Sequence, residues 1–212
     1  MIAGASTTLP PDLRQRAERL LNKGGRRLLG LAGTPGAGKS TLAALLADAL
    51  GDRAMVVPMD GFHLANAELK RLGRAERKGA PDTFDAFGYR ALLARLRHPA
   101  RGETVYAPAF HREIEEPIAG EIPVGPDVQL IISEGNYLLL DTDPWTPVAA
   151  LFDECWFVDV PLEEQKRRLV ERHMRYGRSR EAAEAWVENT DAPNARLIQT
   201  SRARADLILP WV

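Results

Sequence analysis

The chain has 212 residues, of which 45% are hydrophobic and 27% are charged, a composition ordinary for a globular protein with a full hydrophobic core. Its 28 basic and 29 acidic residues give a net charge of -1, which argues against a dedicated nucleic-acid-binding protein. Cys155 is the only cysteine, so an internal disulfide and a cysteine metal cluster are excluded, and a reducing compartment is expected. We expect a single cytoplasmic domain over residues 1–212, because we find neither a signal-peptide pattern nor an apolar run long enough to cross a membrane.

The N-terminal segment is expected to begin as a lead-in and to continue as a helix. Residues 1–11, which end at a pair of prolines, are predicted to form a flexible lead-in. Asp12 is a candidate cap for a helix that runs through Asn22, and the glycines at positions 24 and 25 would end that helix.

Short apolar runs without polar alternation predict the strands of a sheet. These runs occupy residues 28–32, 54–58, 130–132, 156–160 and 207–209. Strands of this kind are covered on both faces, so they indicate an α/β fold with a mainly parallel sheet and helices on either side. Ligands of such sheets bind beyond the carboxyl ends of the strands. The residues that follow these runs are therefore the first candidates for a functional site.

Helical spacing and prolines predict the segments between the strands. Apolar residues over 42–50 fall on one helical face, and a similar pattern covers residues 87–96, with Asp85 as a candidate cap. Pro161 suits the first turn of a further helix. Four prolines between residues 108 and 126 predict either an irregular segment or a hairpin.

A glycine-rich segment, GTPGAGKS at residues 33–40, fits G-x-x-x-x-G-K-[ST], the phosphate-binding loop of P-loop NTPases. It lies between a predicted strand and a predicted helix, as this motif requires. Its glycines allow backbone N–H groups to surround phosphate oxygens, and the helix N-terminus adds partial positive charge. Lys39 is expected to reach the β and γ phosphates of ATP, and the Ser40 hydroxyl to hold Mg²⁺. The candidate nucleotide-binding residues of this loop are Gly33, Thr34, Pro35, Gly36, Ala37, Gly38, Lys39, Ser40 and Thr41.

Three carboxylates follow predicted strands, and each has two interpretations. Phosphoryl transfer to a hydroxyl needs a group that takes the proton of the acceptor, and Asp60 is the candidate for this base; the alternative is a turn aspartate. Glu134 is a candidate Mg²⁺ ligand, directly or through water; the alternative is a cap of the next loop. Asp159 is expected to be structural, as a cap of the helix that follows it; the alternative is a direct role in the site.

The segment 166–180 is rich in arginine and is predicted to form a lid. Arg168, Arg172 and Arg175 are spaced so that they share one face of a helix. Because this helix would begin at the carboxyl edge of the sheet, we expect the segment to close over the triphosphate and neutralise charge on the transferring group. The alternative is a solvated helix face. Arg172 and Arg178 are the candidates for phosphate contact.

Aromatic and basic residues are candidates for the acceptor pocket. The candidate acceptor-binding residues are Asp60, His63, Tyr106, His111, Arg112 and Tyr137. The alternative for residues 106–112 is a hairpin that packs on the core, with His111 exposed at a turn. The alternative for His63 is a place at the start of a helix.

Taken in order, these motifs resemble the uridine kinase, phosphoribulokinase and pantothenate kinase group of P-loop kinases. The resemblance spans residues 28–209 and is carried by Gly33–Thr41, Met59-Asp60-Gly61-Phe62, Pro81-Asp82-Thr83-Phe84-Asp85, Ser133-Glu134-Gly135 and the arginines of 172–178. It implies a three-layer fold with a parallel five-stranded core and an arginine lid. It also implies that Asp60 is the base and that the region of Asn194 helps to hold adenine. Within the group, the chain most resembles small bacterial proteins labelled nucleoside/nucleotide kinase-like or fructose-transport-associated kinases.

One position departs from the uridine kinase pattern. Uridine kinases carry an aspartate for the ribose hydroxyls two residues before the proline of their His-Pro-Asp-Ala-Phe-Asp-like motif, and Gly79 stands at that position in this chain. The resemblance therefore implies an ATP- and Mg²⁺-dependent kinase that acts on a small metabolite such as the sugar fructose. A nucleoside and a pantothenate-type alcohol are the alternative acceptors.

Two other classes of function are weighed against a kinase. A nucleotide-dependent regulatory ATPase that binds a protein partner would keep the phosphate loop, but it leaves Asp60 and the arginine stripe without a purpose. The Asn-Lys-x-Asp signature of GTPases is absent from the sequence. A binding protein without catalysis would tolerate the loss of Lys39, Ser40, Asp60 and Glu134. All four residues are intact, which argues against this class. We expect a small-molecule acceptor as the partner, and neither nucleic acid nor a membrane.

Overall fold

A computed structural model describes residues 8–211 and shows a five-stranded sheet with the strand order β2-β5-β1-β6-β7. Every pair of neighbouring strands in it is parallel, which confirms the predicted parallel sheet. Its strands are β1 (Arg27–Gly33), β2 (Ala54–Val56), β5 (Leu130–Gly135), β6 (Glu154–Asp159) and β7 (Leu207–Pro210). The proline-rich region forms the hairpin that was one of its two predicted alternatives. Its antiparallel strands are β3 (Val105–His111) and β4 (Glu116–Val124).

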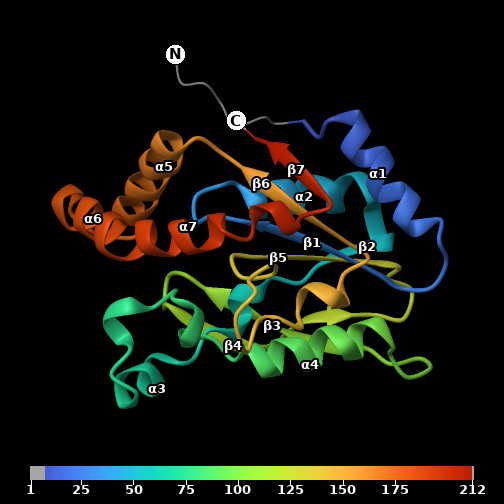
Figure 1. Ribbon diagram of the computed structural model, residues 1–212. Coiled ribbons are helices and arrows are strands. Elements are labelled where there is room, and N and C mark those ends of the chain that lie inside the picture. Colours follow the sequence, from blue (N-terminus) through green and yellow to red (C-terminus); the bar gives the residue numbers. More distant parts are fainter. Residues whose placement is uncertain (1–7, 212) are drawn as a thin grey trace.

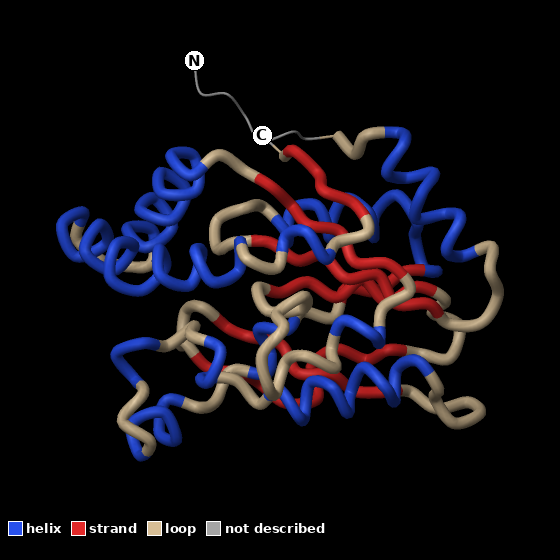
Figure 2. Tube along the Cα trace, in the orientation of Figure 1, coloured by secondary structure: helices blue, strands red, loops and turns tan. Residues whose placement is uncertain are grey.

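Helices cover the sheet on both faces, so the fold has three layers (Figure 1). They are α1 (Pro11–Leu21), α2 (Lys39–Leu50), α3 (Asn66–Arg71), α4 (Ala86–Arg97), α5 (Leu162–Arg175), α6 (Arg180–Trp186) and α7 (Ala192–Gln199). Helices α1 and α2 lie on one face of the sheet, whereas α4 and the β3–β4 hairpin lie on the other (Figures 1 and 2). Helices α5 and α6 extend past one end of the sheet.

Strand β1 shows why the sheet must be covered on both sides. Successive side chains of a strand point to opposite faces. Leu29 and Leu31 accordingly join the buried cluster that includes α1 and α2, and Leu28 and Ala32 join the cluster that includes α4. Because both faces are apolar, both must be removed from water, and the sheet becomes the central layer.

The parallel register brings the polar residues that follow the strands to one edge. Leu31 of β1 lies opposite Glu134 of β5, and the phosphate loop begins two residues after Leu31. Val56 of β2 pairs with Ile132 of the same central strand, so the turn that carries Asp60 lies next to the end of β5. The topology therefore places the phosphate loop and two carboxylates side by side.

The ends of several elements test the predicted caps. Asp85 caps α4, because its Oδ1 accepts a hydrogen bond of 2.8 Å from the N–H of Gly88. The prediction for Asp12 is wrong: α1 already begins at Pro11, which suits a first helical position, and Asp12 lies inside the first turn. Residues 1–7, the larger part of the expected lead-in, lie outside the described residues.

Three helices have no counterpart among the predicted elements. Helices α3 and α6 are short, and α7 contains Pro193 near its start. A π-helix, Val187–Asp191, joins α6 to α7. Within residues 8–211, the structure contains no helix with both the length and the apolar character needed to span a membrane.

The cap of α4 gives a test of the fold. Replacing Asp85 by Ala leaves the N–H of Gly88 without its partner, so the free energy of unfolding should fall by about 1 kcal/mol. Urea unfolding followed by circular dichroism measures this change. The control is Asp48→Ala at an exposed position within α2, which should change stability by less than about 0.5 kcal/mol. Equal stability of Asp85→Ala and the parent protein would contradict the assignment.

Candidate active site

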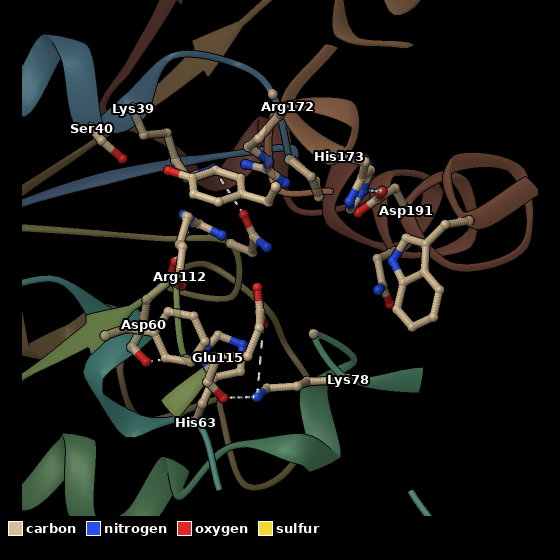
Figure 3. A pocket seen from close by; sticks show the side chains of 18 of the residues that line it. Lys39, Ser40, Asp60, His63, Lys78, Arg112, Glu115, Arg172, His173 and Asp191 are labelled. Atoms are coloured by element: carbon tan, nitrogen blue, oxygen red, sulfur yellow. Dashed lines mark hydrogen bonds and ion pairs between the residues drawn. The ribbon is translucent and has the colours of Figure 1, made fainter. Parts of the chain in front are cut away.

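A pocket of about 620 Å³ opens at the carboxyl edge of the sheet. The phosphate loop and the segment from α5 to α7 form one side, and the β3–β4 hairpin, α3 and the turn after β2 form the other (Figures 1 and 3). Thirteen of the predicted site residues line it: Pro35, Gly36, Gly38, Lys39, Ser40, Thr41, Asp60, His63, Arg112, Glu134, Arg172, Arg178 and Asn194. Residues far apart in the sequence are therefore brought to one space.

The phosphate loop owes its shape to glycines. Gly36 and Gly38 have φ angles of +78° and +91°, a region that disfavours residues with a Cβ atom. A Cβ atom at Gly36 would also lie 3.0 Å from the carbonyl oxygen of Gln165, and one at Gly38 would lie 3.0 Å from the Trp211 ring. The loop leads directly into α2, whose N-terminus faces the pocket. This cradle fits an anionic ligand such as a polyphosphate.

Lys39 is buried in this loop and is held by three acceptors. Its Nζ donates to the carbonyl oxygens of Gly33 and Thr34, each at 2.9 Å, and to Oδ1 of Asn136 at 2.8 Å. An ammonium group has three donors, so these bonds fix the position of the charge. Burial lowers the pKa of Lys39 to about 8.

Ser40 and Glu134 supply oxygen atoms beside the phosphate loop. The Ser40 hydroxyl donates a hydrogen bond of 2.8 Å to Oε1 of Glu134, which is 6% exposed. Burial raises the pKa of Glu134, and the charge of Asp60 raises it further. The part of the chain that the structure describes holds no cluster of three or more His, Cys, Asp or Glu residues arranged for a metal. Mg²⁺ is commonly held by one or two carboxylates together with substrate phosphates and water, so this pair of oxygen donors fits it.

Asp60 lies in the short helical turn Met59–Phe62 after β2 and faces the same pocket. Its Oδ2 accepts a hydrogen bond of 3.0 Å from Nη2 of Arg112, at the end of the hairpin strand β3. Burial raises the pKa of Asp60, but the surrounding basic groups, His63 and Arg112 foremost, outweigh burial and hold the pKa below its usual value. Asp60 is therefore ionised near neutral pH.

His63 forms part of an aromatic wall at the same end of the pocket. Its ring lies 4.0 Å from that of Phe84 and 4.5 Å from that of Phe110, measured between centroids. Burial lowers the pKa of His63, although the charge of the neighbouring Asp60 raises it in part. The His63 ring is tilted against the other two by 36° to 40°, and the three rings present a mostly apolar surface beside the Asp60 carboxylate.

The segment from α5 to α7 carries the basic residues of the predicted lid. Arg172 lines the pocket beside the phosphate loop, and Arg168 is bound to Glu164 at 2.6 Å. The Arg178 guanidinium lies 3.9 Å from the centroid of the Trp186 ring. His173 is bound to Asp191 at 2.8 Å. The contact of Arg172 and Arg178 with phosphate stays a prediction.

Three predicted acceptor residues do not line this pocket. Tyr106 is 59% exposed, because the alternation of β3 turns it away from the core side that Val105 and Ala107 occupy. His111 is bound to Glu113 and Glu121 on the hairpin surface. Tyr137 is fully buried in the core, where its hydroxyl donates to the carbonyl oxygen of Gly79. Their placement corrects the prediction for all three residues.

Other candidates are placed within or behind the loop. The pocket lining does not include Gly33, Thr34 or Ala37; the structure buries all three.

Asp159 is bound to Arg202 at 2.8 Å and does not line the pocket. The N-cap residue of α5 is Pro161, so the prediction that Asp159 caps this helix is wrong. Asp159 instead connects β6 to the segment before β7.

Sequence reasoning missed several residues that line the pocket. Asn136 directly follows β5, two residues after Glu134. This position after a strand could have identified it as a candidate site residue. Lys78 and Glu115 bind each other beside the pocket although they lie 37 residues apart, and no local pattern connects them. Trp186 and Asp191 belong to helical segments that were not predicted.

The fold and this site define a P-loop kinase, and comparison with known proteins gives the family. The sequence model of the Phosphoribulokinase / Uridine kinase family matches residues 28–212. The chain belongs to this family and is an ATP-dependent small-molecule kinase.

Individual relatives agree with this assignment. The chain is 36% identical over 209 residues to "Putative uridine kinase C227.14" of Schizosaccharomyces pombe, covering 93% of this chain and 88% of that protein. It is 39% identical over 160 residues to "ATP-dependent kinase-like protein notR'" of Aspergillus versicolor, covering 72% of this chain and 93% of that protein. A solved structure described as a "putative fructose transport system kinase" from Silicibacter sp. TM1040 is 41% identical, has a TM-score of 0.85, and is covered over 98% of its chain and 93% of this one.

The pKa of Lys39 predicts a pH dependence of nucleotide binding. Bound phosphates favour the charged lysine, which loses its proton as the pH rises through about 8. Mg·ATP affinity should therefore be constant below this pH and fall above it by up to about tenfold per pH unit. Isothermal titration calorimetry between pH 6.5 and 9.5 measures the profile, and binding at the upper end should take up a proton. Lys70→Met at an exposed lysine is the control and should keep the profile; a flat parent profile would contradict the prediction.

Proposed function

We propose that this kinase transfers the γ-phosphoryl group of ATP to a hydroxyl of a small metabolite, with Asp60 as the base. The observation that carries the proposal is the convergence of the buried Lys39, the Ser40–Glu134 pair and Asp60 in one pocket. A site that only bound nucleotide would have no use for an ionised carboxylate opposite the phosphate loop. The proposal keeps the chain a cytoplasmic, single-domain protein.

The phosphate loop would hold the nucleotide. Loop amides and Lys39 bind the β and γ phosphates, while Ser40 and Glu134 supply oxygen ligands for Mg²⁺. The bound metal ion neutralises charge on the phosphates. Asn194, which is buried, lines the pocket together with Arg178 and Trp186 and would help to hold the nucleobase.

Asp60 would position the acceptor and take its proton. Its side chain lines the pocket and is 23% exposed, so a hydroxyl can approach it from the cavity. The acceptor oxygen forms a bond to the γ phosphorus while the bond from that phosphorus to the β–γ bridging oxygen breaks. ADP leaves with the electron pair of that bond, and the hydroxyl proton passes to Asp60.

Residues 166–180 would act as the lid. Arg172 points to the same space as Lys39 (Figure 3) and makes no side-chain hydrogen bond or ion pair with another residue among those described. A guanidinium in this position is available to an equatorial oxygen of the transferring phosphoryl group. Arg178, which stacks on Trp186, would move toward the nucleotide as the lid closes.

A sugar such as fructose is the acceptor that we propose. At the acceptor end of the pocket Lys78 is ion-paired with Glu115, and the Asp60 carboxylate can accept a hydrogen bond from a hydroxyl, so this end favours a polyhydroxyl compound. The aromatic wall around His63 suits the apolar face of a sugar. The relative from Silicibacter, whose name refers to fructose transport, supports this choice. A nucleoside and a pantothenate-type alcohol are the alternatives, and Gly79 offers no side chain to a ribose.

An ATP-consumption screen identifies the acceptor. We expect ADP production to be stimulated by one class among sugars, nucleosides and pantothenate-like alcohols, with fructose and related ketoses first. Chromatography and mass spectrometry should show the phosphorylated acceptor. Slow ATP hydrolysis that no acceptor stimulates would contradict the proposal and favour a regulatory ATPase.

Two variants test the assigned roles. Lys39→Ala should abolish turnover, because it removes the charge that binds the phosphates. Asp60→Asn should keep Mg·ATP binding within about twofold but lower turnover by roughly 10²-fold or more, since the amide cannot accept the proton. Asp48→Asn at an exposed position is the control. Turnover of Asp60→Asn equal to that of the parent would refute the base.

A further inference from the structure

Asp60 and Arg112 form an ion pair inside the pocket that the proposed roles do not explain. The distance from Nη2 of Arg112 to Oδ2 of Asp60 is 3.0 Å. The Arg112 side chain is 35% exposed and the Asp60 side chain is 23% exposed, so the pair faces the cavity. The pair occupies one oxygen of the carboxylate that must accept the proton of the acceptor. A guanidinium has no acceptor atoms and keeps its charge throughout the accessible pH range. While the pair persists, Asp60 is a poor base.

The hairpin turn that follows Arg112 is tied to α3 and to Lys78 on its own side of the pocket. The N–H of Asn66 donates to both carboxylate oxygens of Glu116, at 3.0 and 3.1 Å. The Asn66 side chain and Lys78 both donate to the carbonyl oxygen of Glu115, the only non-glycine residue with a positive φ in the part of the chain described. These bonds hold the turn of the hairpin in place. A change of partner by Arg112 is therefore a movement of its side chain, not of the hairpin.

The charges around the pair favour an anion. Lys39, Arg112 and Arg172 lie close enough to Asp60 and Glu134 to influence one another electrostatically. Asp191 and Glu115 also act on Arg172, but His173 binds the Asp191 carboxylate and Lys78 is ion-paired with Glu115. The remaining charges are three cations and the two carboxylates of Asp60 and Glu134, and they surround the place where the γ-phosphate would lie. Figure 3 shows the side chains of Lys39, Arg112 and Arg172 around the same space. The two arginines repel each other. Burial lowers the pKa of Arg172, and the positive charge of Arg112 lowers it further.

A phosphoryl group is a stronger competitor for Arg112 than the Asp60 carboxylate. It carries more negative charge and offers oxygens that a guanidinium can bind through two parallel hydrogen bonds. Its charge also relieves the repulsion between the two arginines. When Arg112 leaves, one of the cations that keep Asp60 ionised departs, and the carboxylate becomes a better proton acceptor.

We propose that Arg112 changes partner during the reaction: it masks Asp60 in the unliganded protein and moves to the transferring phosphoryl group when Mg·ATP binds. This inference rests on the proposed function and adds a catalytic arginine from the hairpin to those of the lid. Arg112 then stabilises the charge that develops on the phosphoryl oxygens. Asp60, released at the same time, receives the hydroxyl proton as the new phosphorus–oxygen bond forms and the bond to ADP breaks.

Binding of a phosphoryl mimic tests this inference without knowledge of the acceptor. The affinity for Mg·ADP is measured by calorimetry with and without aluminium fluoride, in the parent protein and in Arg112→Gln, Arg112→Lys and Arg71→Gln. Arg71 is an exposed arginine paired with Glu68 on α3 and serves as the matched control. The parent should bind Mg·ADP more tightly when the fluoride is present.

The expected result separates a catalytic role from a structural one. The Mg·ADP affinity of Arg112→Gln should lie within about twofold of the parent's. The factor by which aluminium fluoride increases this affinity should be at least about tenfold smaller in Arg112→Gln than in the parent. Arg112→Lys should keep part of the tightening, and Arg71→Gln should keep all of it. In a crystal structure of the parent with Mg·ADP and aluminium fluoride, Arg112 should contact the fluoride and no longer Asp60.

Two outcomes overturn the inference in distinguishable ways. Full tightening in Arg112→Gln, or an Arg112 that still binds Asp60 in the fluoride complex, would refute the change of partner and leave the proposed kinase function standing. A parent protein that binds neither Mg·ADP nor its fluoride complex would refute the proposed function itself, and this inference with it.

Discussion

The site depends on one buried charge, the ammonium of Lys39. Moving a cation out of water is unfavourable unless hydrogen bonds compensate it, and here two loop carbonyls and Asn136 do so. Those carbonyls belong to Gly33 and Thr34, and the loop then turns into α2 through Gly36 and Gly38, whose φ angles are positive. A cation fixed in a region of low dielectric interacts strongly with a phosphate. The same burial that costs stability therefore prepares the site for its anionic ligand.

The parallel sheet explains why opposite charges gather at one edge. Each strand of the order β2-β5-β1 ends on the same side, so the loop after β1 and the carboxylates after β2 and β5 become neighbours. Burial raises the pKa of Glu134, repulsion from Asp60 raises it further, and the charge of Lys39 acts against both effects. The pocket is stable because its positive and negative groups are interleaved.

The two ends of the pocket have different chemistry because different segments build them. The end that α5 to α7 form is basic and aromatic, with Arg172, Arg178 and Trp186, and it suits a nucleotide. The end that the hairpin and α3 form contains the Lys78–Glu115 ion pair and a wall of tilted aromatic rings, and it suits a small polar acceptor. Arg112 stands where the two ends meet, which gives it access to both the base and the phosphoryl group.

The sequence by itself determined the sheet strands, the phosphate loop, the cap at Asp85 and the carboxylates after β2 and β5, because each depends on local chemistry: apolar runs, glycines in a fixed spacing, and side chains directly after a strand. It misplaced Tyr106 and Tyr137, since the direction of a side chain depends on strand alternation and on packing against residues far along the chain. Only the tertiary structure decided that Lys78 meets Glu115 and that Arg112 binds Asp60. Contacts of this kind arise between segments whose approach is set by the packing of the whole core, and no local pattern records them.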